Sequence, residues 1–170
     1  MSRTQHPRLF APRTAAHTSR IIRFNLYSVH VQGPQHFQRF DFLGLNHYTT
    51  YLVTKNKSKI SMTPSFEADT GGILSQKAEW PKSNSTWLKV VPWGFRKALN
   101  WIKNKYDNPI VFITENGIAL ERGLTDRRRV NYIDAYLRAL HAAILKDNCQ
   151  VIGYTYWSLI DNFEWTRGYS

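Results

Sequence analysis

The sequence predicts an α/β fold in which strands and helices alternate along residues 41–170. Three short apolar runs, of which that at residues 110–114 is rich in β-branched and aromatic residues, have the pattern of buried strands. Two segments between them repeat apolar residues at intervals of three and four, which is typical of amphipathic helices. We therefore expect parallel strands near residues 41–46, 110–114 and 151–157, adjacent in that order and joined by right-handed crossovers.

Length and composition are those of one globular domain, with 42% hydrophobic residues in a chain of 170. A closed eight-stranded α/β barrel typically needs ~250 residues, so the chain is too short to form one. The single cysteine, Cys149, excludes an internal disulfide. No run approaches the ~18 apolar residues that would indicate a membrane-spanning helix. The sequence also shows no cluster of metal-binding residues, and we expect neither a membrane segment nor a metal site.

The net charge of +11 is compatible with a nucleic-acid-binding protein, so its distribution matters. Residues 1–40 hold six Arg and no acidic residue, whereas the remainder has 17 basic and 12 acidic residues. The excess charge is concentrated in a segment that has no nucleic-acid-binding motif. We therefore do not expect nucleic-acid binding.

Residues 1–40 show no sustained apolar period, and Pro7, Pro12 and Pro34 interrupt any long helix. An Arg-rich segment without acidic residues is also typical of a mitochondrial transit peptide, but the prolines argue against its amphipathic helix. The apolar stretch at residues 21–31 is broken by polar residues, unlike that of a secretory signal. We predict an irregular, disordered tail that is unrelated to the rest of the chain.

Residues 54–87 form a long polar connection after the first strand. A loop of this length is usually functional or disordered. Two N-glycosylation sequons occur in it, Asn56-Lys57-Ser58 and Asn84-Ser85-Thr86. The sequons permit a secreted parent protein without showing one.

A helix is predicted near residues 92–106, because Pro92 suits the first helical position. Its apolar residues share one face, which should pack on the sheet: Phe95, Ala98, Leu99, Ile102 and Tyr106. Lys103 and Lys105 interact favourably with the helix dipole in the last turn. Asp107-Asn108-Pro109 then ends the helix.

Glu115 follows the strand at residues 110–114 and precedes Asn116-Gly117, a strong loop signal. A carboxylate at the mouth of a buried strand is costly to desolvate unless it is paired or chemically useful. In α/β barrels, catalytic side chains occupy such positions. From these residues alone, Glu115 is either a catalytic carboxylate or the beginning of a solvated turn.

A second helix is predicted near residues 126–146, with Thr125 and Asp126 as cap residues. Its aliphatic residues repeat at helical spacing and form the face that we expect to pack against the sheet: Val130, Ile133, Leu137, Leu140 and Ile144. The stripe is too short to indicate a coiled coil. Asp147-Asn148 closes the helix before the last strand.

The last strand leads into a segment rich in aromatic and acidic side chains, which include Trp157, Glu164 and Trp165. Indole rings stack on the C–H faces of sugars, and carboxylates accept hydrogen bonds from sugar hydroxyls. The segment therefore predicts a sugar-binding surface.

Three motifs, in this order along the chain, resemble family 1 of the glycoside hydrolases, the β-glucosidase, lactase and myrosinase group. They are Asp41-Phe42-Leu43-Gly44-Leu45-Asn46-His47-Tyr48-Thr49, Ile113-Thr114-Glu115-Asn116-Gly117 and Tyr156-Trp157-Ser158-Leu159-Ile160-Asp161-Asn162-Phe163-Glu164-Trp165. The resemblance covers residues 41–170 and implies a partial (β/α)8 TIM barrel, with about strands six to eight and their helices.

The resemblance implies that Glu115 is the nucleophile of a retaining β-glycosidase. Asn46 and Tyr48 match positions that line the sugar pocket, and the family's phenol at the position of Tyr48 hydrogen-bonds the nucleophile. His47 stands where an aromatic residue is common, which indicates packing rather than catalysis as a base.

The resemblance also implies that Trp157 stacks beneath the sugar and that Glu164 and Trp165 hydrogen-bond its hydroxyls. The expected partner is a small-molecule β-glycoside or oligosaccharide. Retaining hydrolysis requires no cofactor, and we expect none.

Part of the family's active site has no counterpart in this chain. The family's acid/base glutamate lies in an Asn-Glu-Pro motif at the end of the fourth strand, and no Asn-Glu-Pro occurs in this sequence. Asp161 and Glu164 could be proposed as substitutes, but the resemblance assigns Asp161 to structure and Glu164 to sugar binding. We expect a fragment of a β-glycosidase that is inactive alone. The alternatives are a non-catalytic carbohydrate-binding or klotho-like interaction protein and an unrelated small α/β domain.

Overall fold

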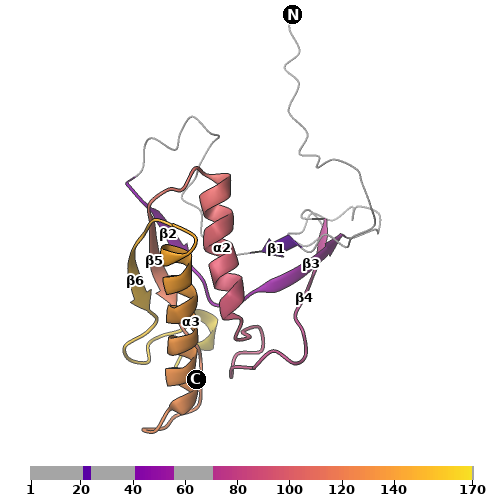
Figure 1. Cartoon of the computed structure of the whole chain (residues 1–170). Coiled ribbons are helices and arrows are strands. Elements are labelled where there is room, and N and C mark those ends of the chain that lie inside the picture. Colours follow the sequence, from indigo (N-terminus) through magenta and orange to yellow (C-terminus); the bar gives the residue numbers. More distant parts are fainter. Residues whose placement is uncertain (1–20, 24–40, 56–70, 170) are drawn as a thin grey trace, which may run out of the picture.

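The computed structural model describes residues 21–23, 41–55 and 71–169, and these form two sheets and two α-helices (Figure 1). In chain order the elements are β1 (Ile21–Arg23), β2 (Leu43–Asn46), β3 (Tyr51–Lys55), β4 (Gly72–Ser75), α2 (Pro92–Lys105), β5 (Val111–Asn116), α3 (Arg127–Leu145), β6 (Val151–Tyr156) and the 3₁₀ helix η2 (Trp165–Arg167).

A parallel sheet in the order β2-β5-β6 confirms the predicted strand arrangement. Leu43 pairs with Val111, which in turn pairs with Val151, so the three strands begin at the same level. Their arrows point the same way in Figure 1. The carboxyl ends of all three strands therefore meet at one edge of the sheet, as in a part of an α/β barrel.

The helix α2 begins at Pro92 and buries the predicted face, which includes Phe95, Ala98, Leu99 and Ile102. It ends where the sequence indicates, because Asp107 and Asn108 adopt positive φ angles of 56° and 53°. Short polar side chains tolerate this left-handed conformation better than other non-glycine residues.

The helix α3 buries part of the predicted face together with two tyrosines that were not predicted. Asp126 caps it as expected, since its side chain accepts a hydrogen bond from the Arg129 N–H (3.0 Å). Of the predicted stripe, Leu140 is buried and Ile133 and Ile144 pack against the core. Val130 and Leu137 are instead 65% and 41% exposed, so the prediction was correct only in part. The buried side chains are those of Tyr132, Tyr136, Leu140 and Ala143. Buried tyrosines are stable here because their hydroxyls have hydrogen-bond partners, Asn116 at the end of β5 for Tyr132 and the Val91 N–H before α2 for Tyr136.

The hydrophobic core lies between the parallel sheet and the two helices. Leu45 of β2 and Val111 and Ile113 of β5 are buried against Phe95 of α2 and Tyr136 of α3. Figure 1 shows α2 and α3 side by side on this face of the sheet. Burial alternates along β5, which is the pattern of a strand that presents one face to a core.

A second sheet, antiparallel in the order β1-β3-β4, was not predicted. It contains β4, in the connection expected to be irregular, and β1, in the segment expected to be an irregular tail. β1 departs from that expectation at residues 21–23. The remainder of residues 1–40 lies outside the described residues, as do residues 56–70 and the sequon at Asn56.

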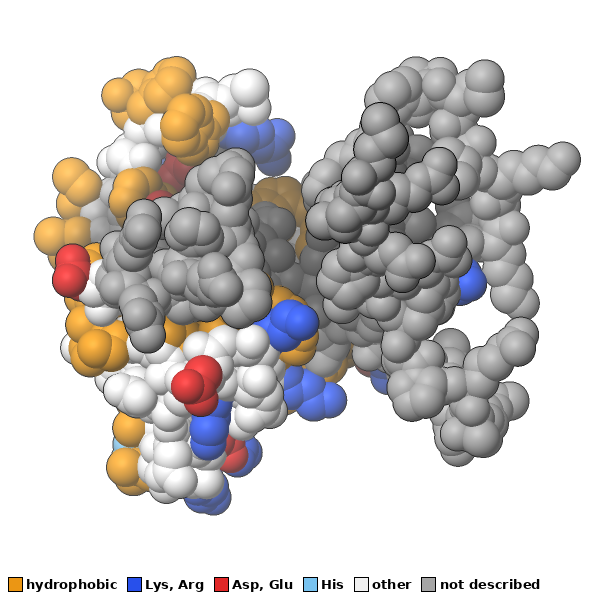
Figure 2. All heavy atoms as spheres, turned by 90° about the horizontal axis from the view of Figure 1, so that it is seen from above, with side chains coloured by type: hydrophobic (Ala, Val, Ile, Leu, Met, Phe, Trp, Pro, Cys, Tyr) orange, Lys and Arg blue, Asp and Glu red, His pale blue; other side chains and the backbone are white. Residues whose placement is uncertain are grey.

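Apolar side chains reach the surface among charges of both signs, as Figure 2 shows for one face. No helix in the described parts of the chain is long and apolar enough to cross a membrane. Across residues 21–23, 41–55 and 71–169, His, Cys, Asp and Glu form no group of three that could hold a metal ion.

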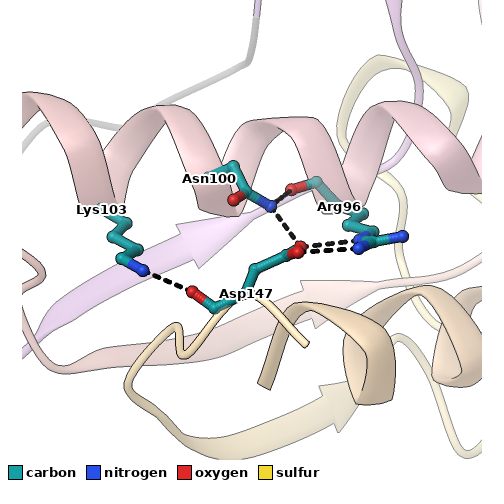
Figure 3. Close-up of polar contacts among 4 residues, drawn as sticks. All are labelled: Arg96, Asn100, Lys103 and Asp147. Carbon is teal, nitrogen blue, oxygen red and sulfur yellow. Dashed lines mark hydrogen bonds and ion pairs between the residues drawn. The ribbon is translucent and has the colours of Figure 1, made fainter. Parts of the chain in front are cut away.

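The carboxylate of Asp147 joins the end of α3 to the side of α2 (Figure 3). Arg96 donates two hydrogen bonds to it, of 2.6 Å and 2.7 Å, and the Asn100 side chain donates a third of 2.6 Å. Lys103 donates to the Asp147 backbone carbonyl. The Arg96 guanidinium, followed by Asn100, holds the pKa of Asp147 well below its usual range.

Replacing Asp147 by Asn should lower the melting temperature, because the bidentate bond to Arg96 is lost. The matched control is Asp134→Asn, since Asp134 accepts a single hydrogen bond from Arg138 on the exposed surface of α3. Exposed pairs of this kind add little stability. Thermal unfolding of both variants should show the larger decrease for Asp147→Asn, and equal decreases would contradict this role.

Candidate active site

The carboxyl ends of the parallel strands bring the predicted residues together. Asn46 at the end of β2 is the register partner of Glu115 in β5. Two backbone hydrogen bonds of 2.9 Å continue beyond this point, from His47 N–H to the Glu115 carbonyl and from Trp157 N–H to the Asn116 carbonyl. Glu115 and Trp157 therefore emerge at the same end of the sheet, as predicted.

The Glu115 carboxylate accepts a hydrogen bond of 2.6 Å at Oε2 from the hydroxyl of Tyr48. This contact agrees with the proximity of the two side chains that the resemblance implies. A short bond from a phenol to a carboxylate fixes the orientation of the acid. Asn46 lies beside this pair in the register, and its Oδ1 accepts a hydrogen bond from the Thr114 hydroxyl.

Asn116 is a fully buried residue that the sequence analysis did not single out. Its Nδ2 donates to the His47 carbonyl (2.7 Å) and to the Tyr132 hydroxyl (2.9 Å), and its Oδ1 accepts from the Tyr154 hydroxyl (2.7 Å). One amide thereby connects β2, α3 and β6 directly behind Glu115. The signal in the sequence that could have indicated this buried role is the position of Asn116, a polar residue between Glu115 and Gly117.

Tyr136 of α3 extends this hydrogen-bonded group to the backbone of Tyr48. Its hydroxyl donates to the Tyr48 carbonyl (3.3 Å) and accepts from the Val91 N–H (3.1 Å), and its ring stacks on Tyr132 at 4.3 Å. Burial raises the pKa of Tyr136 to about 12, as it does that of Tyr154. Both hydroxyls therefore remain protonated donors at neutral pH.

His47 is 2% exposed and packs against the rings of Phe95 and Tyr136, at centroid distances of 4.9 Å and 6.1 Å. Burial lowers its pKa to about 4, so the imidazole is neutral at pH 7. This environment agrees with the packing role expected from the sequence.

A second group of predicted residues follows β6. The indole Nε1 of Trp157 donates to Glu164 Oε1 (2.9 Å), which orients both side chains. Trp157 is 39% exposed, and Trp165, at the beginning of η2, is 85% exposed. The structure thus brings Trp157 and Glu164 together and leaves the Trp165 ring largely open to solvent.

Trp87 adds an aromatic ring that was not predicted. It is 46% exposed and meets Tyr48 edge-on at 6.1 Å. Its carbonyl accepts hydrogen bonds from Gln76 (3.0 Å) and Tyr51 (3.2 Å), which hold this part of the long connection beside the strand ends.

Gly117 allows the backbone of Trp157 to approach the end of β5 closely. A Cβ at Gly117 would lie 1.8 Å from the Trp157 carbonyl oxygen and 2.9 Å from its carbonyl carbon. Both are backbone atoms, so a side chain at this position would have to displace the end of β6. The Asn-Gly signal in the sequence therefore reflects a close backbone approach at the end of β5.

Replacing Gly117 by Ala should destabilise the fold by ~1–3 kcal/mol, the usual effect of inserting a methyl group into a filled space. Gly123→Ala is the matched control, because nothing lies within 4 Å of a Cβ built there. Denaturant unfolding should show a lower stability for Gly117→Ala than for Gly123→Ala. Equal stability of both variants would contradict the close approach.

At one edge of the sheet, this arrangement offers the Glu115 carboxylate with its phenol donor, and after β6 a second carboxylate, Glu164, held by the indole of Trp157. Such a carboxylate can attack an electrophilic carbon or stabilise a developing cation. A retaining glycosidase needs a second carboxyl group ~5–5.5 Å from the first. The contacts of Glu115 described above are with a phenol and with backbone groups.

Comparison with known proteins supports the resemblance. The sequence model of Glycosyl hydrolase family 1 matches residues 29–170, beginning upstream of the three motifs. Myrosinase 1 of the aphid Brevicoryne brassicae is 45% identical over 131 residues, which are 76% of this chain and 28% of that protein. Human lactase/phlorizin hydrolase is 42% identical over 133 residues, 77% of this chain and 7% of that protein.

Solved structures agree with these matches. A rice β-glucosidase variant in a covalent complex with Glc is 40% identical and superposes with a TM-score of 0.71, covering 77% of this chain and 30% of the rice chain. The aphid myrosinase structure superposes with a TM-score of 0.67. The chain therefore spans less than a third of the length of these relatives.

Proposed function

The chain belongs to glycosyl hydrolase family 1, and on this premise we propose that it forms part of a retaining β-glycosidase in which Glu115 is the nucleophile. The observation that carries the proposal is the 2.6 Å hydrogen bond from Tyr48 to Glu115, at the carboxyl end of the central strand β5. It orients a carboxylate at the edge of the sheet, which is where the proposal requires the sugar to bind.

The proposed reaction begins with attack of a Glu115 carboxylate oxygen on the anomeric carbon of a β-glycoside. The bond to the leaving oxygen breaks, and a covalent glycosyl-enzyme ester forms, which water then hydrolyses. Tyr48 keeps one carboxylate oxygen in place while the other attacks. The covalent complex with Glc in the related rice enzyme supports this mechanism.

Trp157 and Glu164 would bind the sugar ring, the indole by stacking and the carboxylate by accepting hydroxyl hydrogen bonds. Their mutual hydrogen bond prepares both groups before the sugar arrives. Trp165 and Asn46 would complete this side of the site. The exposed ring of Trp87 beside Tyr48 would contact the leaving group.

A second carboxylic acid must protonate the leaving oxygen. We propose that an upstream segment supplies it, because Glu164 is bonded to Trp157 and no Asn-Glu-Pro motif occurs in this sequence. The 170 residues alone would then lack hydrolytic activity. The reaction requires no cofactor.

Sequencing the full transcript tests this proposal. We expect an upstream Asn-Glu-Pro motif in the same reading frame, and loss of β-glucoside hydrolysis by the encoded protein on Glu115→Gln substitution. A longer reading frame that contains no Asn-Glu-Pro motif would instead favour the non-catalytic sugar-binding or klotho-like interpretation.

A further inference from the structure

The tip of an exposed loop carries one of the two glycosylation sequons. Residues 81–90 fold back on themselves, with hydrogen bonds from Val90 N–H to the Pro81 carbonyl (2.9 Å) and from Ser83 N–H to the Leu88 carbonyl (3.2 Å). Asn84 lies at the turn between the two paired segments of this loop. A sequon in such a turn differs from one in a buried helix or strand, where a glycan could not be accommodated.

The local structure fixes the backbone of Asn84 and leaves its side chain exposed. Its N–H donates to the Ala119 carbonyl (3.0 Å), and Ser83 Oγ bonds both the N–H and the carbonyl of Ser85. Within the described residues the Asn84 amide group makes no hydrogen bond. Thr86, which supplies the hydroxyl required at the third position, is also exposed.

We propose that Asn84 is an N-glycosylation site. The amide Nδ2 would form a bond to the anomeric carbon of an oligosaccharide carried on a lipid pyrophosphate. The bond from that carbon to the pyrophosphate oxygen would break, the lipid pyrophosphate would leave, and the amide would lose one proton. A glycan is bulky and hydrophilic, so it requires the exposed position that this turn provides.

The position of Asn84 indicates which part of the molecule the glycan would lie beside. Ala119, which holds the Asn84 backbone, follows β5 by three residues, and the exposed Trp87 lies in the same loop. The glycan would therefore stand at the rim of the strand ends. This inference does not depend on Glu115 acting as a nucleophile.

The test expresses the full chain behind a cleavable secretion signal in eukaryotic cells and locates glycans by peptide mass spectrometry. Asn56→Gln removes the other sequon, so the glycan on that variant should map to Asn84. In this background, Asn84→Gln and Thr86→Ala should abolish glycosylation, whereas Thr86→Ser should retain it. Because the glycan is read from peptides, a variant that fails to fold still gives a result.

An amidase that releases N-glycans should remove this one from the natively folded chain, since the turn is exposed. An unmodified Asn84 in the Asn56→Gln chain, alongside a glycosylated control protein from the same cells, would overturn the proposal. A glycan that persists in Thr86→Ala would overturn it as well.

Discussion

Lowering the pH from 6.5 to 4 should reduce the free energy of unfolding by about 3 kcal/mol through a single side chain, His47. Burial lowers the pKa of this imidazole from 6.5 to about 4. The unfolded chain takes up a proton near pH 6.5, whereas the folded chain does so only near pH 4. Between these values the unfolded state binds more protons, so stability is complete above pH 6.5 and decreases as the pH falls.

Urea unfolding at several pH values between 4 and 7 measures this effect. The matched control is His47→Phe, which keeps a ring against Phe95 and Tyr136 and removes the titrating group. The difference in stability between the two proteins should change by about 3 kcal/mol across the window. A difference that is constant with pH would show that the imidazole is not desolvated in the fold.

The parallel sheet could be predicted from the sequence because its signals are local. Each strand is a short apolar run, rich in β-branched and aromatic residues in β5 and β6, and an amphipathic helix precedes each of these two strands. The order of β2, β5 and β6 then follows from the rules that govern parallel strands. The end of α2 could be predicted for a similar reason, since Asp107-Asn108-Pro109 is a local stop signal.

The buried face of α3 could not be predicted from apolar spacing alone. Tyr132 and Tyr136 are one helical turn apart, and a count of aliphatic residues passes over them. They can be buried because their hydroxyls have partners that are distant in the sequence. Asn116 donates a hydrogen bond to the Tyr132 hydroxyl, and the Tyr48 carbonyl accepts one from the Tyr136 hydroxyl. The antiparallel sheet could not be predicted for the same reason, since its paired strands are distant from one another in the sequence.

The candidate site was recovered in part. The meeting of Tyr48 and Glu115 agrees with the expectation from the family motifs, and the structure adds Asn116 as the group that joins the strand ends behind them. Trp87 was missed because it lies in a polar connection without periodicity. Its position depends on hydrogen bonds to Gln76 and Tyr51 rather than on a local pattern.

The second large effect concerns activity: the isolated chain should not hydrolyse β-glucosides at an enzyme-like rate. General-acid assistance is typically worth ~10²–10⁴-fold, and the proposed mechanism draws it from outside these residues. The loss should be larger than this, because a site that lacks much of its binding surface neither orients the sugar nor excludes water. The oriented Glu115 carboxylate by itself does not compensate for both deficits.

The measurement that tests the account most directly is turnover of an aryl β-glucoside, whose good leaving group reduces the need for an acid. Purified wild-type chain and the Glu115→Gln variant should be assayed side by side, so that contaminating hydrolases contribute equally to both. We expect the two rates to be the same and to equal the background. Robust turnover by the wild-type chain that disappears in Glu115→Gln would contradict the account, because another carboxylate within these 170 residues would then supply the acid.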